Sequence, residues 1–270
     1  MAITRIGQGE RDVRGCGLRY RWLGTAGFEL VSGRTSILLD PYMTRNPGAR
    51  PAQPLKARDL GHAEAVFLTH GHFDHTFDVP QLVENSRAVV YASPTVCASL
   101  ALRGVAWTRL RPRWPGEAAE VGPFRVTAVP ACHVTFDAHL VLATLWRCRG
   151  VLADLARLGT SRYPTGEVLG WLVEVEGKTL LHLGSACMRW VPDRRVDAFL
   201  VPVQGRTDIC AVAADLVARV RPGTVIPHHH DDFYPPLSQY IDLEPFLREI
   251  GRRHPGVKVR LPSINRLEEL

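Results

Sequence analysis

Short apolar runs recur along the chain, and glycine, proline or charged residues separate most of them. The first three runs span residues 18–23, 27–31 and 36–39. They are rich in β-branched and aromatic residues and are interrupted by Gly24 and Gly33, which is typical of strands joined by tight turns. We therefore expect an antiparallel meander that ends at Asp40.

The middle of the chain alternates between strand-like and helix-like segments. Strands are expected over residues 65–68, 89–91 and 125–129, and helices over residues 79–85 and 94–102. Ser93 and Pro94 suit the start of the second helix, because serine caps free backbone N–H groups and proline fits the first helical position. Residues 138–145 fit a strand or a helix, and residues 152–158 fit a short helix. The alternation predicts an α/β fold.

The second half of the chain continues the alternation. A hairpin is expected from strands over residues 168–174 and 179–183, with the turn at Glu176-Gly177. Apolar residues at helical spacing predict a helix over residues 209–220. The remaining expected elements are strands over residues 197–201, 224–227 and 257–260 and a surface helix over residues 243–253.

Length and composition indicate one domain. With 270 residues and 46% hydrophobic content, the chain can bury one large core, and no linker-like segment divides it. We expect a single domain over residues 1–270, in which residues 135–165 form an insertion that shapes the pocket. The chain has no apolar stretch long enough to span a membrane and no signal-peptide pattern at its start, so a cytoplasmic protein is expected.

Cysteine spacing and charge add little that is specific. The six cysteines lie scattered without paired short spacings, so free thiols are expected. The net charge of +6 is diffuse and compatible with an anionic small-molecule substrate. The basic clusters at residues 109–113 and 252–253 are interpreted as solvated surfaces, and a nucleic-acid partner is not expected.

The most informative segment is Thr69–His75, which directly follows the expected strand over residues 65–68. His70 and His72 are two residues apart, so in an extended chain both side chains point to one face and can hold one ion. Asp74 and His75 follow where the chain must turn, and could face a second ion or a water on the first. A solvated histidine-rich loop is the alternative. Polar side chains crowded at a buried strand end would be poorly solvated without a cation, which favours the metal site.

Other polar residues follow other strands. His133 follows the strand over residues 125–129, Gly184-Ser185 follows residues 179–183, and three consecutive histidines, His228, His229 and His230, follow residues 224–227. An active site commonly forms where several strand ends meet at one edge of a layered α/β domain. Imidazole and carboxylate ligands suit zinc, manganese or iron better than calcium or magnesium.

This order of motifs resembles the metallo-β-lactamase superfamily across nearly the whole chain. The motifs are His-x-His-x-Asp-His at residues 70–75, a lone histidine after a strand, a strand that ends in Gly-x, and a Pro-x-His sequence at residues 227–229. Residues 22–28 and 38–42 are similar to the opening hairpins of that family. The resemblance implies a four-layer αββα sandwich. The branch most similar to this chain includes ascorbate-6-phosphate lactonase-like and phospholipase-D-like hydrolases.

The resemblance also implies two sets of metal ligands. These are His70, His72 and His133 for the first ion and Asp74, His75 and His229 for the second. His228 and His230 are second choices for ligation and otherwise would be hydrogen-bonded or exposed histidines. Asp40 either orients a ligand histidine, as a carboxylate behind the metal site does, or simply forms the turn before Pro41.

One residue departs from the family pattern. Ser185 stands where the family usually places an aspartate that bridges the two ions. A neutral serine hydroxyl is a poor metal ligand, so we expect one tightly held ion or two ions held unequally. A thiolate from Cys187 could substitute, but a buried inert thiol is the favoured interpretation.

The expected chemistry is hydrolysis. A bound divalent ion, with zinc favoured over manganese or iron, lowers the pKa of coordinated water toward ~7 and so supplies hydroxide for attack on a carbonyl or phosphorus centre. Asp74 would hold this water or accept its proton. Arg206 either pairs with an anionic substrate group or lies on the surface. The predicted function is a metal-dependent hydrolase of a small-molecule ester, lactone or phosphoester.

Three alternatives stay open. The first is a nuclease of the same fold, which the positive charge mildly favours. The second is a degenerate member that binds metal or ligand without hydrolysis, as the replacement at Ser185 suggests. The third is an iron-dependent oxidoreductase. It is the weakest alternative, because the redox branches of the family generally rely on the carboxylate that is missing at this position.

Overall fold

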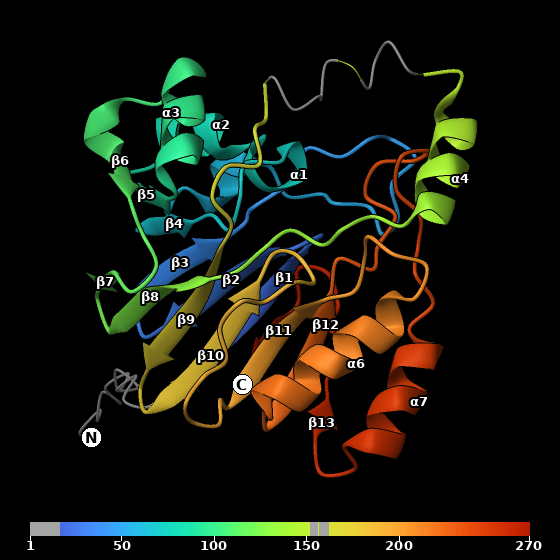
Figure 1. Ribbon diagram of the computed structural model, residues 1–270. Helices are drawn as coiled ribbons and strands as arrows, with labels where there is room; N and C mark the ends of the chain where they lie inside the picture. Colours follow the sequence, from blue (N-terminus) through green and yellow to red (C-terminus); the bar gives the residue numbers. More distant parts are fainter. Residues whose placement is uncertain (1–16, 152–155, 157–161) are drawn as a thin grey trace, which may run out of the picture.

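Two β-sheets stacked face to face form the centre of the protein (Figure 1). The computed structural model describes residues 17–151, 156 and 162–270. In spatial order, the first sheet contains β14 (Leu267–Glu269), β1 (Arg19–Gly24), β2 (Gly27–Ser32), β3 (Thr35–Leu39), β4 (Ala65–Phe67), β5 (Val89–Ala92) and β6 (Leu110–Pro112). The second contains β13 (Lys258–Val259), β12 (Thr224–His228), β11 (Ala198–Pro202), β10 (Lys178–Leu183), β9 (Leu169–Val175), β8 (Phe124–Pro130) and β7 (Ala118–Val121).

Each sheet is partly antiparallel and partly parallel, and this decides where the strands end. In the first sheet, β3 and β4 run parallel. In the second sheet, β10, β11 and β12 run parallel to one another. Strand β8 points the same way as β10, because both are antiparallel to the strand between them, β9. The polar segments that follow these strands therefore emerge at a common edge of their sheet.

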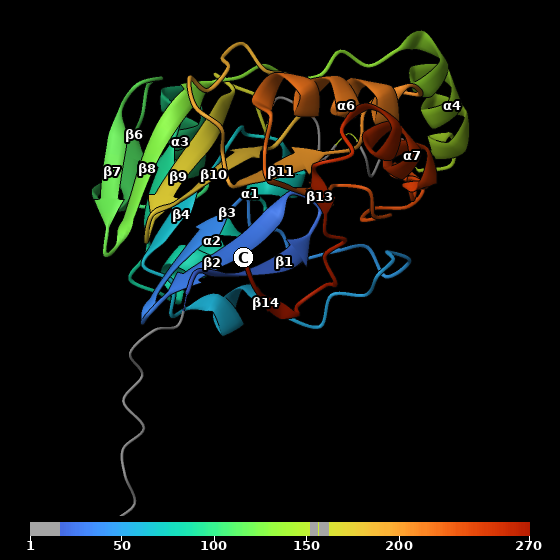
Figure 2. The ribbon, with the colours of Figure 1, turned by 90° about the horizontal axis from the view of Figure 1, so that it is seen from below.

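The described part of the chain contains six α-helices, of which four cover the outer faces of the sheets. The six are α1 (Phe73–Thr76), α2 (Val79–Glu84), α3 (Pro94–Leu102), α4 (Ala138–Cys148), α6 (Ile209–Val220) and α7 (Glu244–Arg253), with short 3-10 helices η1 (Ala57–Leu60) and η2 (Trp107–Arg109). Helices α2 and α3 pack on the first sheet, and α6 and α7 pack on the second, as Figure 2 shows for the latter pair. This is the predicted αββα sandwich. No helix in the described ranges is long and apolar enough to cross a membrane.

Side-chain alternation along each strand builds the layers. In β3, Ile37 and Leu39 face the core between the sheets, and Leu38 faces the opposite side, where α2 and α3 pack. Strand β3 is thus apolar on both faces, which explains its continuous hydrophobic run. Between the sheets, the rings of Phe67 and Trp171 meet edge to face with centroids 5.1 Å apart, so aromatic packing joins the two sheets.

Most expected elements are confirmed within a residue or two, and the differences have local causes. The segment that fitted a strand or a helix is the helix α4, whose N-cap Asp137 accepts a hydrogen bond from the backbone N–H of Leu140 at 2.9 Å. The strands β6, β7 and β14 were not expected, because they are short edge strands with charged residues. The expected helix over residues 152–158 lies largely outside the described residues.

Candidate metal centre

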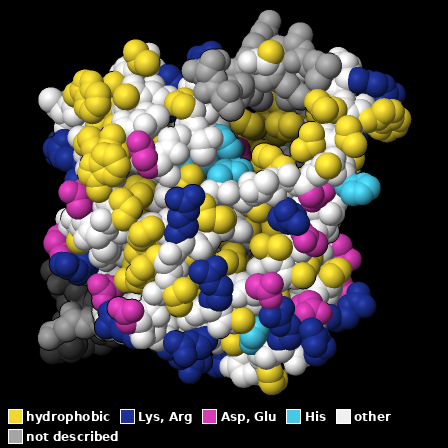
Figure 3. Space-filling model, viewed as in Figure 1, with side chains coloured by type: hydrophobic (Ala, Val, Ile, Leu, Met, Phe, Trp, Pro, Cys, Tyr) yellow, Lys and Arg dark blue, Asp and Glu magenta, His cyan; other side chains and the backbone are white. Residues whose placement is uncertain are grey.

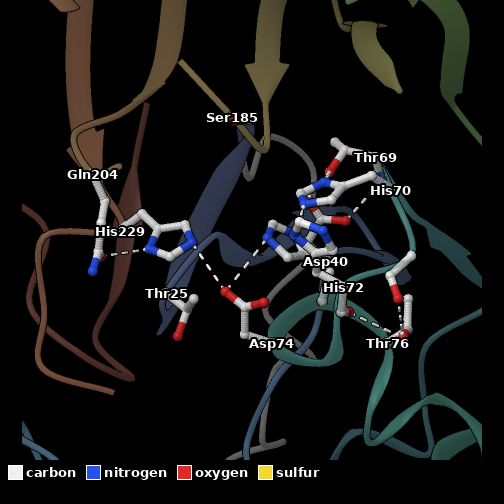
Figure 4. A network of polar contacts seen from close by, with 12 residues as sticks. Thr25, Asp40, Thr69, His70, His72, Asp74, Thr76, Ser185, Gln204 and His229 are labelled. Atoms are coloured by element: carbon white, nitrogen blue, oxygen red, sulfur yellow. Dashed lines mark hydrogen bonds and ion pairs between the residues drawn. The ribbon is translucent and has the colours of Figure 1, made fainter. Parts of the chain in front are cut away.

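The six predicted ligands lie together at the edge of the sandwich, in two groups. The histidine trio consists of His70, His72 and His133, and the aspartate trio consists of Asp74, His75 and His229. In each trio, one donor atom from every residue lies within 4.8 Å of the others. Figure 4 shows how side chains from distant segments converge here. The structure thus brings together both sets that the sequence indicated.

The local chain path presents these side chains. His70 and His72 leave the end of β4, and the short helix α1 places Asp74 and His75 in its single turn. Glycine is needed at position 71, between the two histidines, because a Cβ there would lie 2.0 Å from the carbonyl oxygen of Pro164. His229 follows β12 with a φ of +61°, a left-handed conformation that histidine adopts only where the surroundings enforce it.

In the histidine trio, every ring is held by one nitrogen, which leaves the other nitrogen available. The partners are Thr69 Oγ1 for His70 Nδ1 at 3.0 Å, Thr165 Oγ1 for His72 Nε2 at 2.9 Å, and the carbonyl of Val134 for His133 Nδ1 at 2.8 Å. The remaining nitrogens of His70 and His72 lie 3.1 Å apart. This arrangement, with one nitrogen anchored and one directed inward, is typical of histidines that ligate a metal.

The histidine trio is electrically neutral near pH 7. Burial and the neighbouring imidazoles hold the pKa of His70 well below its usual value. Burial also lowers the pKa of His72 to about 4 and lowers that of His133. Neutral imidazole is the form that binds a metal ion, so these residues are ready to bind one without losing a proton.

In the aspartate trio, one carboxylate faces two imidazoles. Asp74 Oδ2 lies 3.1 Å from His229 Nε2 and 3.7 Å from His75 Nε2. The other nitrogen of each ring is again anchored: His229 Nδ1 lies 2.8 Å from Gln204 Oε1, and His75 Nδ1 lies 3.0 Å from Asp40 Oδ2. Burial alone would raise the pKa of Asp74, but His75 and His229 outweigh it and hold the pKa well below the usual range.

Asp40 stands at a turn and also contacts one of the predicted ligand histidines. Its φ of +41° places it at a left-handed turn, and its buried carboxylate contacts His75, His182 Nε2 at 3.1 Å, and the N–H and hydroxyl of Thr69 at 2.8 and 2.7 Å. Gly184 lies against this network, because a Cβ there would lie 2.0 Å from Thr69 Oγ1. Asp40 therefore links the strand ends of both sheets behind the aspartate trio.

Ser185 and Cys187 hold the loop that presents His133. The hydroxyl of Ser185 accepts a hydrogen bond from the backbone N–H of Val134 at 2.9 Å. Cys187 forms a disulfide with Cys132, with an S–S distance of 2.02 Å. The expectation of free thiols is therefore wrong for this pair, and Cys187 has no thiolate to offer a metal.

The disulfide was missed for a reason that lies in the tertiary structure. Its two cysteines are 55 residues apart in the sequence, and they come together only because the segments that follow β8 and β10 meet beyond the sheet. Cys97, Cys148 and Cys210 are free, and Cys16 lies outside the described residues. Disulfides persist mainly in oxidising compartments, so this pair is an argument against the predicted cytoplasmic location. The location itself stays a prediction.

The other predicted residues lie outside both trios. His228 is buried against Phe28, with ring centroids 5.3 Å apart, and His230 stacks on Trp22 at 5.1 Å. Arg206 lines the cavity beside the site, but its guanidinium donates to both carboxylate oxygens of Asp208 and to a backbone carbonyl. Because its charge is already paired with Asp208 at the protein surface, Arg206 is a weak candidate for binding an anionic substrate.

Sequence reasoning missed the residues behind the ligands. Gln204 follows β11 at the same sheet edge, so its position after a strand could have indicated it. His182, inside β10, and Thr165, in an irregular segment, had no such signal. Their roles depend on contacts across the two sheets, which no local pattern encodes.

A cavity of about 480 Å³ opens beside the two trios. Histidines stand at its rim, and much of its visible wall is hydrophobic (Figure 3). Its lining includes Phe73, Tyr163 and Phe233 from the sandwich edge and residues of α4 on the opposite side. The volume is in the range typical of small-molecule sites.

Comparison with known proteins identifies relatives along most of the chain. The family model described as beta-lactamase superfamily domain matches residues 35–230. A metal-dependent hydrolase of Xanthobacter autotrophicus is 32% identical over 254 residues, which cover 91% of this chain and 95% of that protein.

Two solved structures show the same fold. The metallo hydrolase Igni18 of Ignicoccus hospitalis aligns with a TM-score of 0.66 at 18% identity, over 94% of this chain and all of that one (100%). The metallo-beta-lactamase fold protein YhfI of Bacillus subtilis aligns with a TM-score of 0.60 at 13% identity, over 93% and 98% of the two chains.

Proposed function

The chain belongs to the metallo-β-lactamase superfamily, and from this premise we propose that it is a hydrolase that holds its metal through the histidine and aspartate trios. Metal-dependent hydrolysis is the activity named for its relatives. The observation that supports the ligand assignment is the state of the five imidazoles. Each has one nitrogen within 3.0 Å of an oxygen outside the trios, so the other is left for a cation.

The donor set fits a transition metal. Five imidazoles and one carboxylate match zinc well, and they also suit manganese or iron, whereas calcium and magnesium prefer oxygen ligands. When bound, such an ion lowers the pKa of water and polarises the oxygen of a carbonyl or phosphoryl group. We favour zinc for this site because its preferred ligands include both residue types.

Asp74 is the residue suited to handle the proton of the attacking water. Its carboxylate is ionised, because His75 and His229 hold its pKa well below the usual range. It lies at the cavity wall, within reach of a water beside the trios. In the proposed reaction, water adds its hydroxyl to the acyl or phosphoryl centre, the bond to the leaving oxygen breaks, and the water proton passes by way of Asp74 to that oxygen.

Ser185 makes the two trios unequal. A carboxylate at this position could contact both ions. Ser185 instead has a hydroxyl, which accepts a hydrogen bond from the backbone N–H of Val134. The histidine trio keeps three neutral imidazoles, while the aspartate trio lacks a second carboxylate. We therefore propose tight binding of one ion by the histidine trio and weaker binding of a second ion by the aspartate trio.

The cavity favours a small molecule over a nucleic acid. Nucleic-acid sites are basic grooves that follow a phosphate backbone, whereas this cavity is largely apolar, and the charge of Arg206 in its wall is paired with Asp208. The site thus supports hydrolysis of a small ester, lactone or phosphoester. The more specific branch of lactonase-like and phospholipase-D-like enzymes stays a prediction.

Metal analysis combined with kinetics tests this function. Purified protein should contain a transition metal, hydrolyse at least one ester, lactone or phosphodiester in a broad panel, and lose that activity with a chelator. His70→Ala should lower metal content, while His230→Ala, outside both trios, should not. Metal-loaded protein that is inert across the panel would instead support a degenerate binding protein, and dioxygen consumption with an iron-loaded sample would support an oxidoreductase.

A further inference from the structure

Helix α4 stands apart from the packed sandwich and exposes apolar side chains. It projects beyond the sheet layers (Figure 1), and of its residues only Cys148 is buried. Leu145 is 54% exposed and Val141 is 40% exposed. A helix with this much free apolar surface does not gain its position from burial in the core.

Polar contacts at both ends hold α4 in place. At its start, Asp137 accepts hydrogen bonds from the backbone N–H groups of Leu140 at 2.9 Å and Thr207 at 2.7 Å. At its end, Arg147 Nε donates to the carbonyl of Pro236 at 3.3 Å. The helix is thus fixed between the loop after β11 and the loop after β12, and among the described residues no hydrogen bond to another segment holds its middle turns.

One face of α4 forms a wall of the cavity. Leu140, Val141, Thr144 and Leu145 line it, and their spacing of three and four residues places them on one side of the helix. Leu142 does not line the cavity and is 66% exposed. The apolar face that lines the cavity therefore differs from the face that meets bulk solvent.

The opposite wall is apolar as well and reaches the metal centre. Phe73, Tyr163 and Phe233 are buried in a common aromatic cluster and line the cavity, which also includes residues of both trios. A single space therefore contains the catalytic groups at one end and two hydrophobic walls beside them. An apolar cavity with a few convergent polar groups typically binds a ligand of matching polarity.

We propose that the substrate has a hydrocarbon tail that lies between α4 and the aromatic cluster while its scissile group sits at the two trios. This assignment rests on the proposed hydrolase function and specifies its substrate class. The tail covers Val141 and Leu145, whose exposed apolar surface would otherwise face water. Arg147 and Arg206, the arginines of the cavity wall, both hydrogen-bond to protein oxygens, so the tail needs no charge.

A chain-length series tests the proposal. Metal-loaded protein would be assayed with 4-nitrophenyl esters of straight-chain acids from acetate to decanoate. Each methylene buried between the two walls should raise kcat/KM about two- to fourfold, until the cavity is filled. Leu145→Ser should flatten this dependence, because it removes apolar surface from one wall of the cavity. Leu142→Ser, on the same helix but outside the cavity, is the matched control and should keep the full dependence.

A binding measurement separates this proposal from the hydrolase function. Straight-chain alcohols from butanol to decanol, which cannot be hydrolysed, would displace an anilinonaphthalene sulfonate dye from the metal-loaded protein. Longer alcohols should bind more tightly, and Leu145→Ser should weaken this binding while Leu142→Ser should not. This result supports the apolar site even if no ester is hydrolysed. Ester hydrolysis and alcohol binding that are both independent of chain length would overturn the proposal while leaving the hydrolase function intact.

A second copy of the chain is the competing occupant of this helix face. Sedimentation measures the oligomeric state of the protein. If wild type is a dimer and Leu145→Ser is a monomer, α4 is a self-association surface and the tail assignment is wrong. An unchanged mass, with circular dichroism confirming that the variant is folded, leaves the substrate tail as the occupant.

Discussion

The hydroxyl of Ser185 accepts a hydrogen bond from the backbone N–H of Val134 at 2.9 Å. Ser185, interpreted from the sequence as standing in place of a bridging aspartate, is therefore attached to the loop that contains His133. One residue on either side of that histidine is tied to the end of β10, since Cys132 is bonded to Cys187. The segment after β10 thus supports the histidine trio mechanically, although it offers no bridging carboxylate.

Replacing Ser185 by aspartate should strengthen the second metal site. A carboxylate between the two trios can contact both ions, so Ser185→Asp should raise the affinity for the second ion at least about tenfold, in line with the effect of carboxylates near metal sites. Metal titration followed by calorimetry would measure this. Ser185→Ala, which only removes the hydrogen bond to Val134, is the control and should cost about 1 kcal/mol of stability. Equal second-ion affinity in Ser185→Asp and wild type would contradict the prediction.

Breaking the disulfide should loosen the histidine trio. Cys187→Ser frees the loop before His133, so the affinity for the tightly held ion should fall. Thermal unfolding should show that the free energy of unfolding decreases by about 2 to 4 kcal/mol. Cys210→Ser removes a free, half-buried thiol on α6 and should change neither property. If Cys187→Ser binds metal as tightly as wild type, the disulfide has no part in positioning His133.

Gln204 should position His229 without touching the reacting atoms. Its side-chain oxygen accepts a hydrogen bond from His229 Nδ1, which directs Nε2 toward Asp74. Gln204→Leu keeps the side-chain size but removes the acceptor, so metal affinity of the aspartate trio should fall about 10- to 100-fold. Gln204→Glu keeps an acceptor and should retain most of the affinity. A purely structural role would instead lower stability equally in both variants and leave metal affinity intact.

Acid should remove the contribution of Glu29 to the stability of the fold. Glu29 lies in β2, away from the metal centre. This buried carboxylate contacts His62 Nε2 at 2.6 Å, Ser36 Oγ at 2.7 Å and Arg21 Nη2 at 2.5 Å. Burial would raise the pKa of Glu29, but these partners outweigh it and lower the pKa. The folded state therefore binds the proton less readily than the unfolded chain does.

The stability contribution of Glu29 is accordingly complete above its unfolded pKa of about 4.3 and is lost as the pH falls through the lower folded value. At pH 7, Glu29→Gln should cost about 2 to 3 kcal/mol, less than a fully buried ion pair because Arg21 and His62 are partly exposed. Urea unfolding at a series of pH values would show this difference shrinking below about pH 4. A difference that stays constant down to pH 2 would exclude the ionic contribution.

Local pattern was sufficient for most of the fold. The meander of β1 to β3 and the helix α6 were predictable because apolar spacing and turn residues are local signals. The short edge strands β6, β7 and β14 were not, since they form by pairing with a neighbour and have little apolar pattern of their own. The helix α4 had an ambiguous sequence, and its N-cap at Asp137 resolved it in favour of a helix.

The sequence by itself indicated that polar residues follow several strands and meet at one sheet edge, and its resemblance to the metallo-β-lactamase superfamily implied the fold class and the grouping of six candidate ligands. The tertiary structure decided what surrounds them: the disulfide of Cys132 with Cys187, the contact of Gln204 with His229, and the position of α4 over the cavity. Each of these depends on which segments, far apart in the sequence, become neighbours when the two sheets stack. Spacing along the chain can show that a residue stands at a strand end, but only packing shows what stands opposite.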